Sequence, residues 1–344
     1  MSEIEQALSM LAGCGPEFGT NGLSNHGPMA SEALIALGRD DAVEAWVARY
    51  RKKLEDRPPN VERIEREAWR EALGDMRRVS DWEDYFSIEM EGTDWPSLLE
   101  DWAPRLAPGM MAGATHGIIR TAHAVRSLGR EDTPERRAEF VTGLAYWAAR
   151  YQVLPGLPEK VPAGLPSAAI TGVPLMPSET RDSRRTNIFT AVTELDGFEP
   201  FALAINMAAP GDDVSAFLSD LTATMAMRYL QNAGPASIAY VHTVTAPSAV
   251  RMIVPYISPE TSHTLARYVW QACAAIHSRY HVEHEVVLPD TLPTREDLID
   301  HAVASGDEHA IKFTEACLRE NALSPNLAFF AGPLDMSTRY GRTR

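Results

Sequence analysis

Five side chains in this sequence could bind a single metal ion. Four histidines, His26, His116, His242 and His309, lie inside apolar segments with helical patterning. Lys312 follows three residues after His309, so both side chains can share one face of a helix. Polar groups in apolar surroundings cost stability unless they are satisfied. One shared metal ion would satisfy all five, and imidazole-rich sites suit iron, zinc, copper or nickel.

Each of these residues also has a simpler interpretation. A single histidine on an apolar helical face is usually a core residue that bonds to a nearby carbonyl. Glu308 and Lys312 have the i, i+4 spacing of a salt bridge on a solvated helix face. His123 follows seven residues after His116, so one of the two could be a ligand and the other could support it.

Motifs for other kinds of chemistry are missing from the sequence. The segment at residues 13–19, GCGPEFG, only approaches a dinucleotide loop, contains Pro16 and follows no strand. No phosphate-binding loop of the G-x-x-x-x-G-K-[ST] type and no G-x-S-x-G element occurs. The three cysteines are far apart, which argues against a disulfide framework and against a cysteine-rich zinc site.

The composition excludes several classes of partner. The formal net charge of −15 argues against binding to nucleic acid and to anionic membrane surfaces. No apolar run approaches the roughly 18 residues of a membrane helix. Glu3 and Glu5 stand where a signal peptide would carry basic residues, so we expect a cytoplasmic protein. The sequence does not indicate an oligomeric state.

Helical periodicity dominates the chain, and we predict an all-α, bundle-like fold in a single unit over residues 1–344. Helices are predicted within segments 31–56 (interrupted at Gly38), 61–78, 96–108, 109–129, 133–156, 212–234, 238–257, 258–285, 293–306 and 307–323. Residues 155–187 are rich in proline, and we expect a long loop or linker between two helical halves. Residues 186–195 are ambiguous between helix and strand.

Several segments of the chain resemble the questin oxidase-like family. They are NHGPMASEALIALG (25–38), HGIIRTAHAVRSL (116–128), GLAYWAARYQVLPG (143–156), VHTVTAPSAVRMIVPYI (241–257) and DEHAIKFTEACLRE (307–320). They occur in the family's order over nearly the whole chain. The fungal relatives tend to carry a second histidine soon after the first, where this chain has Met29 or nearby residues.

The resemblance implies an α-helical oxygenase that acts on polyketide-derived aromatic compounds such as anthraquinones. Its partners would be a small aromatic substrate and O2. Ring opening in the family is described either as a Baeyer–Villiger-type oxidation with NADPH or as dioxygenation by non-haem iron. Because the sequence lacks a dinucleotide or flavin loop, Fe(II) is the favoured cofactor.

The resemblance also implies a ligand set, with His26, His116, His242 and His309 as metal ligands and Lys312 as the fifth. A neutral lysine is a poor ligand, whereas a lysine carboxylated by CO2 supplies an anionic oxygen. Carboxylation requires the neutral amine, which burial and a nearby cation favour by lowering the lysine pKa.

Further residues are candidates for the reaction itself. Arg120 could orient a substrate oxyanion, and His123 is the second catalytic candidate. The aromatic candidates for a substrate pocket are Tyr146, Trp147, Tyr151, Tyr240 and Trp270. Each aromatic also fits plain packing in the core.

Two other functions stay open from the sequence. One is an NADPH-dependent or cofactor-poor oxygenase without catalytic metal, in which histidines act as acids and bases on a phenolate. The other is a helical scaffold or ligand-binding protein without enzymatic activity, which is consistent with the long helices.

Overall fold

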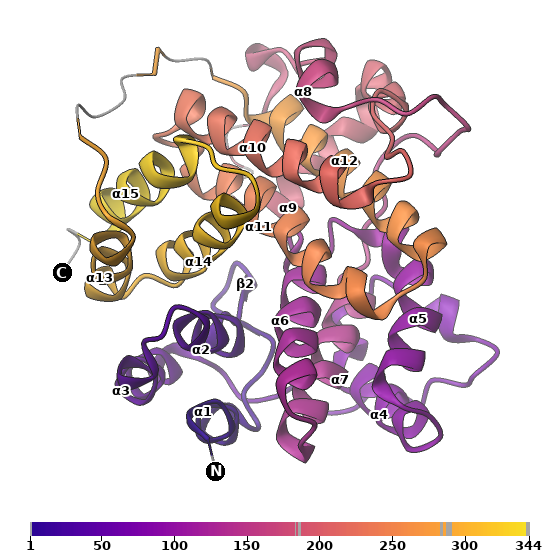
Figure 1. The fold of residues 1–344 in the computed structure, drawn as a ribbon. Coiled ribbons are helices and arrows are strands. Elements are labelled where there is room, and N and C mark those ends of the chain that lie inside the picture. Colours follow the sequence, from indigo (N-terminus) through magenta and orange to yellow (C-terminus); the bar gives the residue numbers. More distant parts are fainter. Residues whose placement is uncertain (1, 183, 185–186, 283–284, 287–290, 342–344) are drawn as a thin grey trace. The chain divides into compact units, whose positions relative to one another are not determined.

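The computed structural model describes residues 2–182, 184, 187–282, 285–286 and 291–341, and its fold is all-α as predicted (Figure 1). Among these residues the strands are limited to β1 (Glu17–Phe18) and β2 (Leu23–Ser24), which pair in antiparallel fashion. The chain divides into two compact units. The first contains Met1–Val153 and Met252–Thr261, and the second contains Leu154–Arg251 and Ser262–Arg344.

The first unit contains seven of the described α-helices. They are α1 (Glu3–Leu11), α2 (Gly27–Ala36), α3 (Asp40–Tyr50), α4 (Val79–Glu91), α5 (Trp95–Leu106), α6 (His116–Arg130) and α7 (Pro134–Ala149), with short 3-10 turns at η1 (Arg51–Lys53), η2 (Trp69–Ala72), η3 (Met76–Arg78), η4 (Ala107–Gly109) and η9 (Val254–Tyr256). Helix α7 packs along both α6 and α4, and α2 packs on α6 (Figure 1). The helix predicted within residues 133–156 begins after Thr133, and proline occupies its first position, where a missing N–H costs nothing.

Two glycines bring α6 and α7 close together. A β-carbon added at Gly117 would lie 2.8 Å from the Cα of Trp147. One added at Gly143 would lie 3.0 Å from the Cα of Thr121. Because only glycine leaves room for a backbone at these distances, the two positions fix how α6 packs on α7.

The helix predicted over residues 61–78 is wrong, because that segment contains only the short turns η2 and η3. The Asp81 carboxylate accepts hydrogen bonds from the backbone N–H groups of Val61 and Glu62, at 2.9 and 3.1 Å. These bonds hold the two backbone N–H groups, and with them the start of the segment, in a loop. Gly74 adopts a φ of +77°, which interrupts any continuing helix.

The second unit contains the remaining α-helices of the described chain. They are α8 (Pro166–Ala169), α9 (Ile188–Ala191), α10 (Val214–Asn232), α11 (Ser237–Ile253), α12 (Pro259–Tyr280), α13 (Arg295–Ser305), α14 (Glu308–Leu323) and α15 (Ala328–Tyr340), with the turns η5 (Ile170–Gly172), η6 (Ser178–Thr180), η7 (Val192–Gly197) and η8 (Glu199–Asn206). The last residues of α11 and the first of α12 belong to the first unit. Helix α15 packs against α10, α13 and α14. The sequence did not indicate α15, because Pro333 interrupts its pattern.

The proline-rich segment lies at the start of the second unit, directly after the boundary at Val153. It contains the short elements α8, η5 and η6. The side-chain amide of Gln271 donates to the carbonyl of Pro155 at 2.9 Å, which ties the segment to α12. The ambiguous stretch that follows it is helical from Ile188 onward, through α9 and η7.

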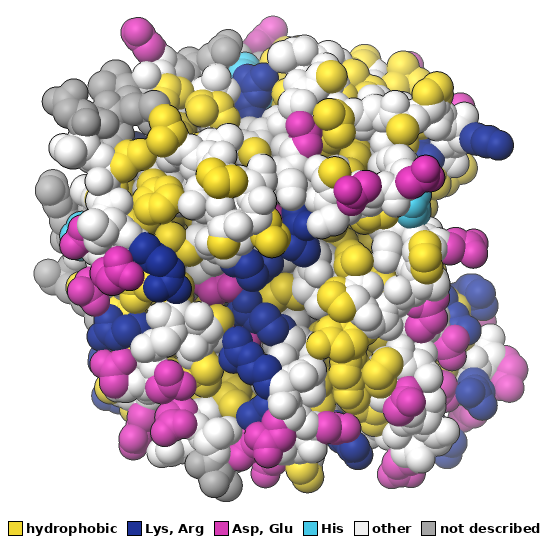
Figure 2. Space-filling model, viewed as in Figure 1, with side chains coloured by type: hydrophobic (Ala, Val, Ile, Leu, Met, Phe, Trp, Pro, Cys, Tyr) yellow, Lys and Arg dark blue, Asp and Glu magenta, His cyan; other side chains and the backbone are white. Residues whose placement is uncertain are grey.

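No helix in the described ranges is long and apolar enough to cross a membrane. The surface shown in Figure 2 carries both acidic and basic side chains. The net charge of −15 therefore does not make this face uniformly negative.

Candidate metal centre

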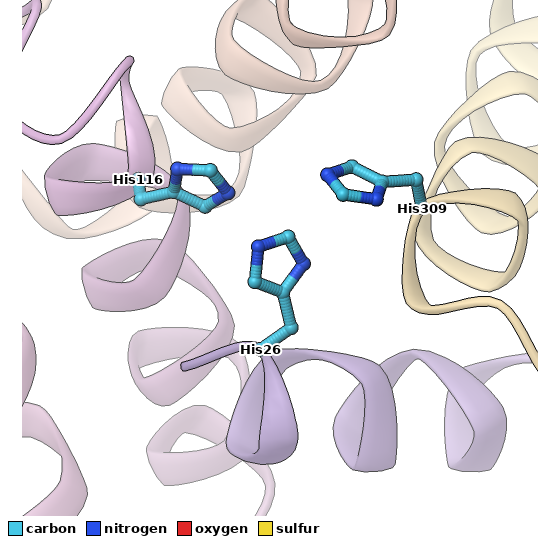
Figure 3. A group of neighbouring side chains, drawn as sticks. All are labelled: His26, His116 and His309. Carbon is cyan, nitrogen blue, oxygen red and sulfur yellow. The ribbon is translucent and has the colours of Figure 1, made fainter. Parts of the chain in front are cut away.

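The first unit contains a pair of buried histidines, His26 and His116. Their ring centroids are 4.5 Å apart and the rings are tilted by 53°. Both side chains are at least 95% buried. Figure 3 shows the two imidazoles facing each other from the start of α2 and the start of α6; it also draws His309, a residue of α14 in the other unit. Two imidazoles at this separation can supply adjacent ligands to one metal ion.

Hydrogen bonds on both sides of His26 fix its backbone. The N–H of His26 donates to the hydroxyl of Tyr50 at 2.7 Å. The side chain of Asn25 donates to the carbonyl of Gly15 at 3.0 Å and accepts from the N–H of Gly27 at 2.9 Å. The loop before α2 is thus held from α3 and from the segment that leads into β1.

His116 follows a left-handed turn. Gly113, Ala114 and Thr115 have φ angles of 54°, 59° and 70°. The helix predicted over residues 109–129 therefore begins only at His116, and this part of the prediction is wrong. Left-handed backbone costs a residue other than glycine roughly 1–2 kcal/mol. Strain of this kind concentrates at functional sites.

The ring of His116 is fixed in one tautomer. Its Nδ1 lies 2.5 Å from the carbonyl oxygen of Gly113. A carbonyl only accepts, so Nδ1 carries the proton and donates it. In the neutral ring, Nε2 then holds the lone pair that a metal would bind. Metal-binding histidines in proteins typically donate their other ring N–H in this way.

The second unit contains a matching pair, His242 on α11 and His309 on α14. Their ring centroids are 5.6 Å apart and the rings are close to perpendicular, at 67°. Nδ1 of His242 lies 2.7 Å from the carbonyl of Ile238, which selects the same tautomer as in His116. Burial, with a smaller contribution from Lys312, lowers the pKa of His242 to about 3. His242 is therefore neutral at pH 7 and keeps its lone pair.

Lys312 follows His309 by three residues on α14 and is buried. Its side chain is only 2% exposed. Burial lowers the pKa of Lys312 to about 7, although Glu308 and Asp307 act in the opposite direction. The interpretation of Lys312 as a salt-bridge partner on a solvated face does not fit this burial. At neutral pH a large share of the amine is uncharged, as carboxylation requires.

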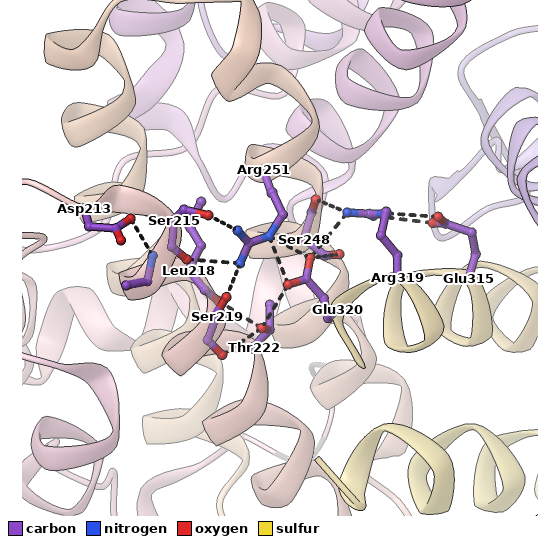
Figure 4. Close-up of polar contacts among 11 residues, drawn as sticks. Asp213, Ser215, Leu218, Ser219, Thr222, Ser248, Arg251, Glu315, Arg319 and Glu320 are labelled. Atoms are coloured by element: carbon purple, nitrogen blue, oxygen red, sulfur yellow. Dashed lines mark hydrogen bonds and ion pairs between the residues drawn. The ribbon is translucent and has the colours of Figure 1, made fainter. Parts of the chain in front are cut away.

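An ion-pair network holds α11 and α14 together within the second unit (Figure 4). The buried carboxylate of Glu320 on α14 accepts from Nε of Arg251 at 3.0 Å and from the hydroxyl of Ser248 at 2.8 Å, both on α11. Arg319 donates to the carbonyl of Ser248 at 3.0 Å. The helices that carry His242 and His309 are thereby fixed to one another.

Arg120 is buried on α6 and already has a carboxylate partner. Its Nε and Nη2 donate to Glu139 at 2.6 and 2.8 Å. Burial by itself lowers the pKa of Arg120, but Glu139 outweighs burial and the net shift is upward. The remaining Nη1 has no hydrogen-bond partner among the described residues. The guanidinium edge that contacts Glu139 is therefore not available to a substrate.

His123, the other catalytic candidate, contacts a carboxylate that the sequence did not point to. Its Nδ1 lies 2.7 Å from Glu32 of α2. Arg126 binds the same carboxylate, with Nε at 2.8 Å from one oxygen. This buried cluster joins α2, which directly follows His26, to α6, which begins at His116.

The aromatic candidates of the first unit are Tyr146, Trp147 and Tyr151. The hydroxyl of Tyr146 donates to Glu17 at 2.9 Å, and the indole of Trp147 donates to the carbonyl of Gly109 at 3.2 Å. The ring of Tyr151 covers the face of Gly109, where an added β-carbon would lie 2.2 Å from it. All three therefore have packing or hydrogen-bonding roles within their own unit.

Tyr240 and Trp270 belong to the second unit, and both are fully buried. The hydroxyl of Tyr240 lies 2.8 Å from Nδ1 of His277, and the indole of Trp270 donates to the carbonyl of Ala204 at 2.8 Å. Burial raises the pKa of Tyr240, so its hydroxyl stays protonated. The hydroxyl of Tyr240 and the ring of His277 thus satisfy each other's hydrogen bonding inside the second unit.

The family of the chain follows from a comparison of sequences. The sequence model of the family described as Questin oxidase-like matches residues 23–204, more than half of the 344 residues. The matched range contains His26 and His116, whereas His242 and Lys312 lie outside it. No curated protein matches the chain.

Proposed function

The chain belongs to the questin oxidase-like family, and from this premise we propose that it is an oxygenase that uses a non-haem metal, iron(II), to oxidise an aromatic or quinone substrate of polyketide type with O2. One observation supports the proposal above all. Each unit contains a pair of close imidazoles, and in each pair one ring donates its Nδ1–H to a backbone carbonyl. Buried histidines prepared in this way are typical of metal sites.

The donor set fits a transition metal better than a hard cation. Imidazole nitrogen suits iron, whereas magnesium and calcium prefer oxygen ligands. The lowered pKa of His242 keeps that ligand neutral at pH 7. The lowered pKa of Lys312 leaves its amine able to react with CO2, and the resulting carbamate would add one anionic oxygen to four neutral ligands.

The proposed ligands are His26 and His116 from the first unit, with His242, His309 and Lys312 from the second. The proposal requires that one ion bind all five together. Bound iron would supply the redox chemistry by which O2 reacts with an aromatic ring. The protein's own contribution is to keep the imidazole lone pairs available and to hold the ligands in apolar surroundings.

Metal analysis of single variants tests the shared site. Protein from iron-supplemented cells is expected to contain about one iron per chain, and His116→Ala and His309→Ala should each lose nearly all of it. If each pair bound metal on its own, either variant would retain about half of the wild-type content, which would contradict a single site. His301→Ala is the control, because His301 is exposed on α13.

Oxygen uptake tests the activity. With anthraquinones or simpler hydroxyquinones as substrates, uptake should require iron, stop on addition of a chelator and return when Fe(II) is restored. NADPH is added in a parallel series to determine whether a reductant is needed. Full activity in the presence of chelator would contradict the metal and support the NADPH-dependent alternative.

A further inference from the structure

We propose that Tyr146 is a positioning residue that holds both histidines of the first unit, rather than a wall of the substrate pocket. Tyr146 is buried on α7, and its side chain contacts the segment that leads into His26 and the turn that leads into His116. The consequence for metal binding rests on the proposed function; the positioning itself does not.

The contact toward His26 is a directed chain of hydrogen bonds. The hydroxyl of Tyr146 donates to a carboxylate oxygen of Glu17 at 2.9 Å. Its single hydrogen is used there, so the hydroxyl of Ser24, 2.6 Å away, must be the donor to Tyr146. Ser24 ends β2, two residues before His26. Tyr146 thus bonds to both strands of the N-terminal hairpin.

The contact toward His116 is steric. A β-carbon added at Gly113 would lie 2.5 Å from the hydroxyl oxygen of Tyr146 and 2.9 Å from its Cζ. The tip of the tyrosine therefore covers the glycine that begins the left-handed turn. The carbonyl of this same glycine accepts the Nδ1–H of His116. A shift of Tyr146 would move the group that selects the tautomer of His116.

Glu17, the acceptor of the Tyr146 hydroxyl, is itself held by an ion pair with Arg150. Nε of Arg150 lies 2.6 Å from Glu17, and Nη2 binds the second carboxylate oxygen. Arg150 follows Tyr146 by four residues, at the end of α7. Glu17 is thus held in place from the helix that carries Tyr146. Such a bidentate pair has a defined geometry, which makes the acceptor of Tyr146 rigid.

The test replaces the hydroxyl and keeps the ring. Tyr146→Phe loses the bonds to Glu17 and Ser24. In metal-free protein at fixed pH, the Nδ1–H of His116 is followed by NMR of selectively 15N-labelled histidine. We expect its exchange with water to become at least tenfold faster. Cobalt(II) binding, followed by visible absorbance, is expected to weaken by about 10–100-fold, as for other residues that orient metal ligands.

Two further variants keep the test decisive. Tyr85→Phe is the matched control, because Tyr85 is a buried tyrosine of α4 in the same unit whose hydroxyl makes no hydrogen bond within the described chain. It should change neither readout. Ser24→Ala removes one of the two bonds and should give an intermediate effect, which also covers the case in which Tyr146→Phe does not fold.

The outcomes separate this proposal from the proposed function. A Tyr146→Phe protein that melts at a lower temperature but keeps the wild-type Nδ1–H exchange of His116 would overturn the positioning role. If wild-type protein binds no cobalt or iron, the metal proposal fails, and the exchange measurement still decides the role of Tyr146.

Discussion

The imidazole of His123 is bound to the carboxylate of Glu32 at 2.7 Å, although the two residues are 91 positions apart in the chain. Arg126 shares the same carboxylate, and all three side chains are largely removed from solvent. Burial by itself raises the pKa of Glu32, but Arg126 and His123 outweigh burial and hold the pKa at about 2. The carboxylate of Glu32 is therefore ionised over the whole physiological range.

Acid should destabilise the protein through this cluster. Because the folded-state pKa of Glu32 is lowered, its contribution is fully present above the ordinary value of 4.5 and disappears as pH falls toward 2. Glu32→Gln should lower the free energy of unfolding at pH 7 by roughly 3–5 kcal/mol and flatten its fall between pH 4.5 and 2. Urea titrations at several pH values measure this. Glu44→Gln, at an exposed site on α3, serves as the control.

Lys312 should make the stability of metal-free protein depend on pH in a second, more alkaline window. Its pKa is lowered from 10.5 to about 7, so between these values the unfolded chain binds the extra proton. Stability then rises with pH in this window, by at most about 1.4 kcal/mol per pH unit. Lys312→Met should be more stable than wild type below pH 7, with an advantage that shrinks toward pH 10.5. An equal advantage at pH 6 and pH 10 would contradict the lowered pKa.

Removing the amine should also remove the metal. Lys312→Ala is expected to lose most of its iron and its turnover while its helical circular dichroism remains. Added bicarbonate should improve reconstitution of the wild type and leave the variant unchanged, because only the wild type can form the carbamate. A variant with full iron content would remove Lys312 from the ligand set, and Glu308 and Glu315 would be the next candidates.

Removing one partner of the ion pair between Arg251 and Glu320 should cost far more unfolding free energy than replacing both partners. Glu320→Met alone leaves a buried guanidinium without its carboxylate and should cost roughly 3–5 kcal/mol of unfolding free energy. The double variant with Arg251→Met should recover much of that loss, since no buried charge remains unpaired. Chemical denaturation of the three proteins gives the coupling energy. Strictly additive losses would show that the two side chains do not stabilise each other.

Neighbouring residues of the left-handed turn should respond in opposite ways. Gly113→Ala should destabilise the protein strongly, because the new β-carbon would lie 2.5 Å from the hydroxyl of Tyr146. Ala114→Gly should be neutral or stabilising by about 1 kcal/mol, because it relieves a φ of 59° at a residue other than glycine. Thermal unfolding of both variants is sufficient. A destabilised Ala114→Gly protein would indicate that packing of the alanine methyl group contributes more stability than the strained backbone removes.

The parts of the fold that could be predicted are those whose signals are local. Thr133 and Pro134 mark the start of α7, and the Asp307 carboxylate caps α14 by accepting from the N–H groups of His309 and Ala310. Segment 61–78 shows the limit of such patterns. Its apolar stripe resembles a helix, but Asp81, from the next element, binds two of its N–H groups and keeps it irregular.

The candidate site also has parts that could be predicted from the sequence and parts that could not. Apolar patterning placed His26, His116 and His242 in apolar surroundings, and the structure confirms that they are buried. For Lys312 the sequence left a solvated helix face open, and the structure shows that this residue is buried as well. The partners that fix them were not predictable, because Tyr50 meets His26 only through the packing of α3 beside α2. The turn before His116 gave no signal either, since Ala114 and Thr115 ordinarily favour right-handed backbone.

The segment Met252–Thr261 belongs to the first unit although it follows most of α11 in the chain, and this has a consequence for biosynthesis. Tyr256 lies against Gly129, where an added β-carbon would be 2.1 Å from its hydroxyl, and its ring is 4.8 Å from that of Trp95. Glu100 accepts hydrogen bonds from Ser258 and Thr261. A nascent chain that has left the ribosome only as far as Val153 lacks these contacts. The first unit reaches its complete packing only after residue 261 has been translated, so the second unit is already more than half synthesised when the first is finished.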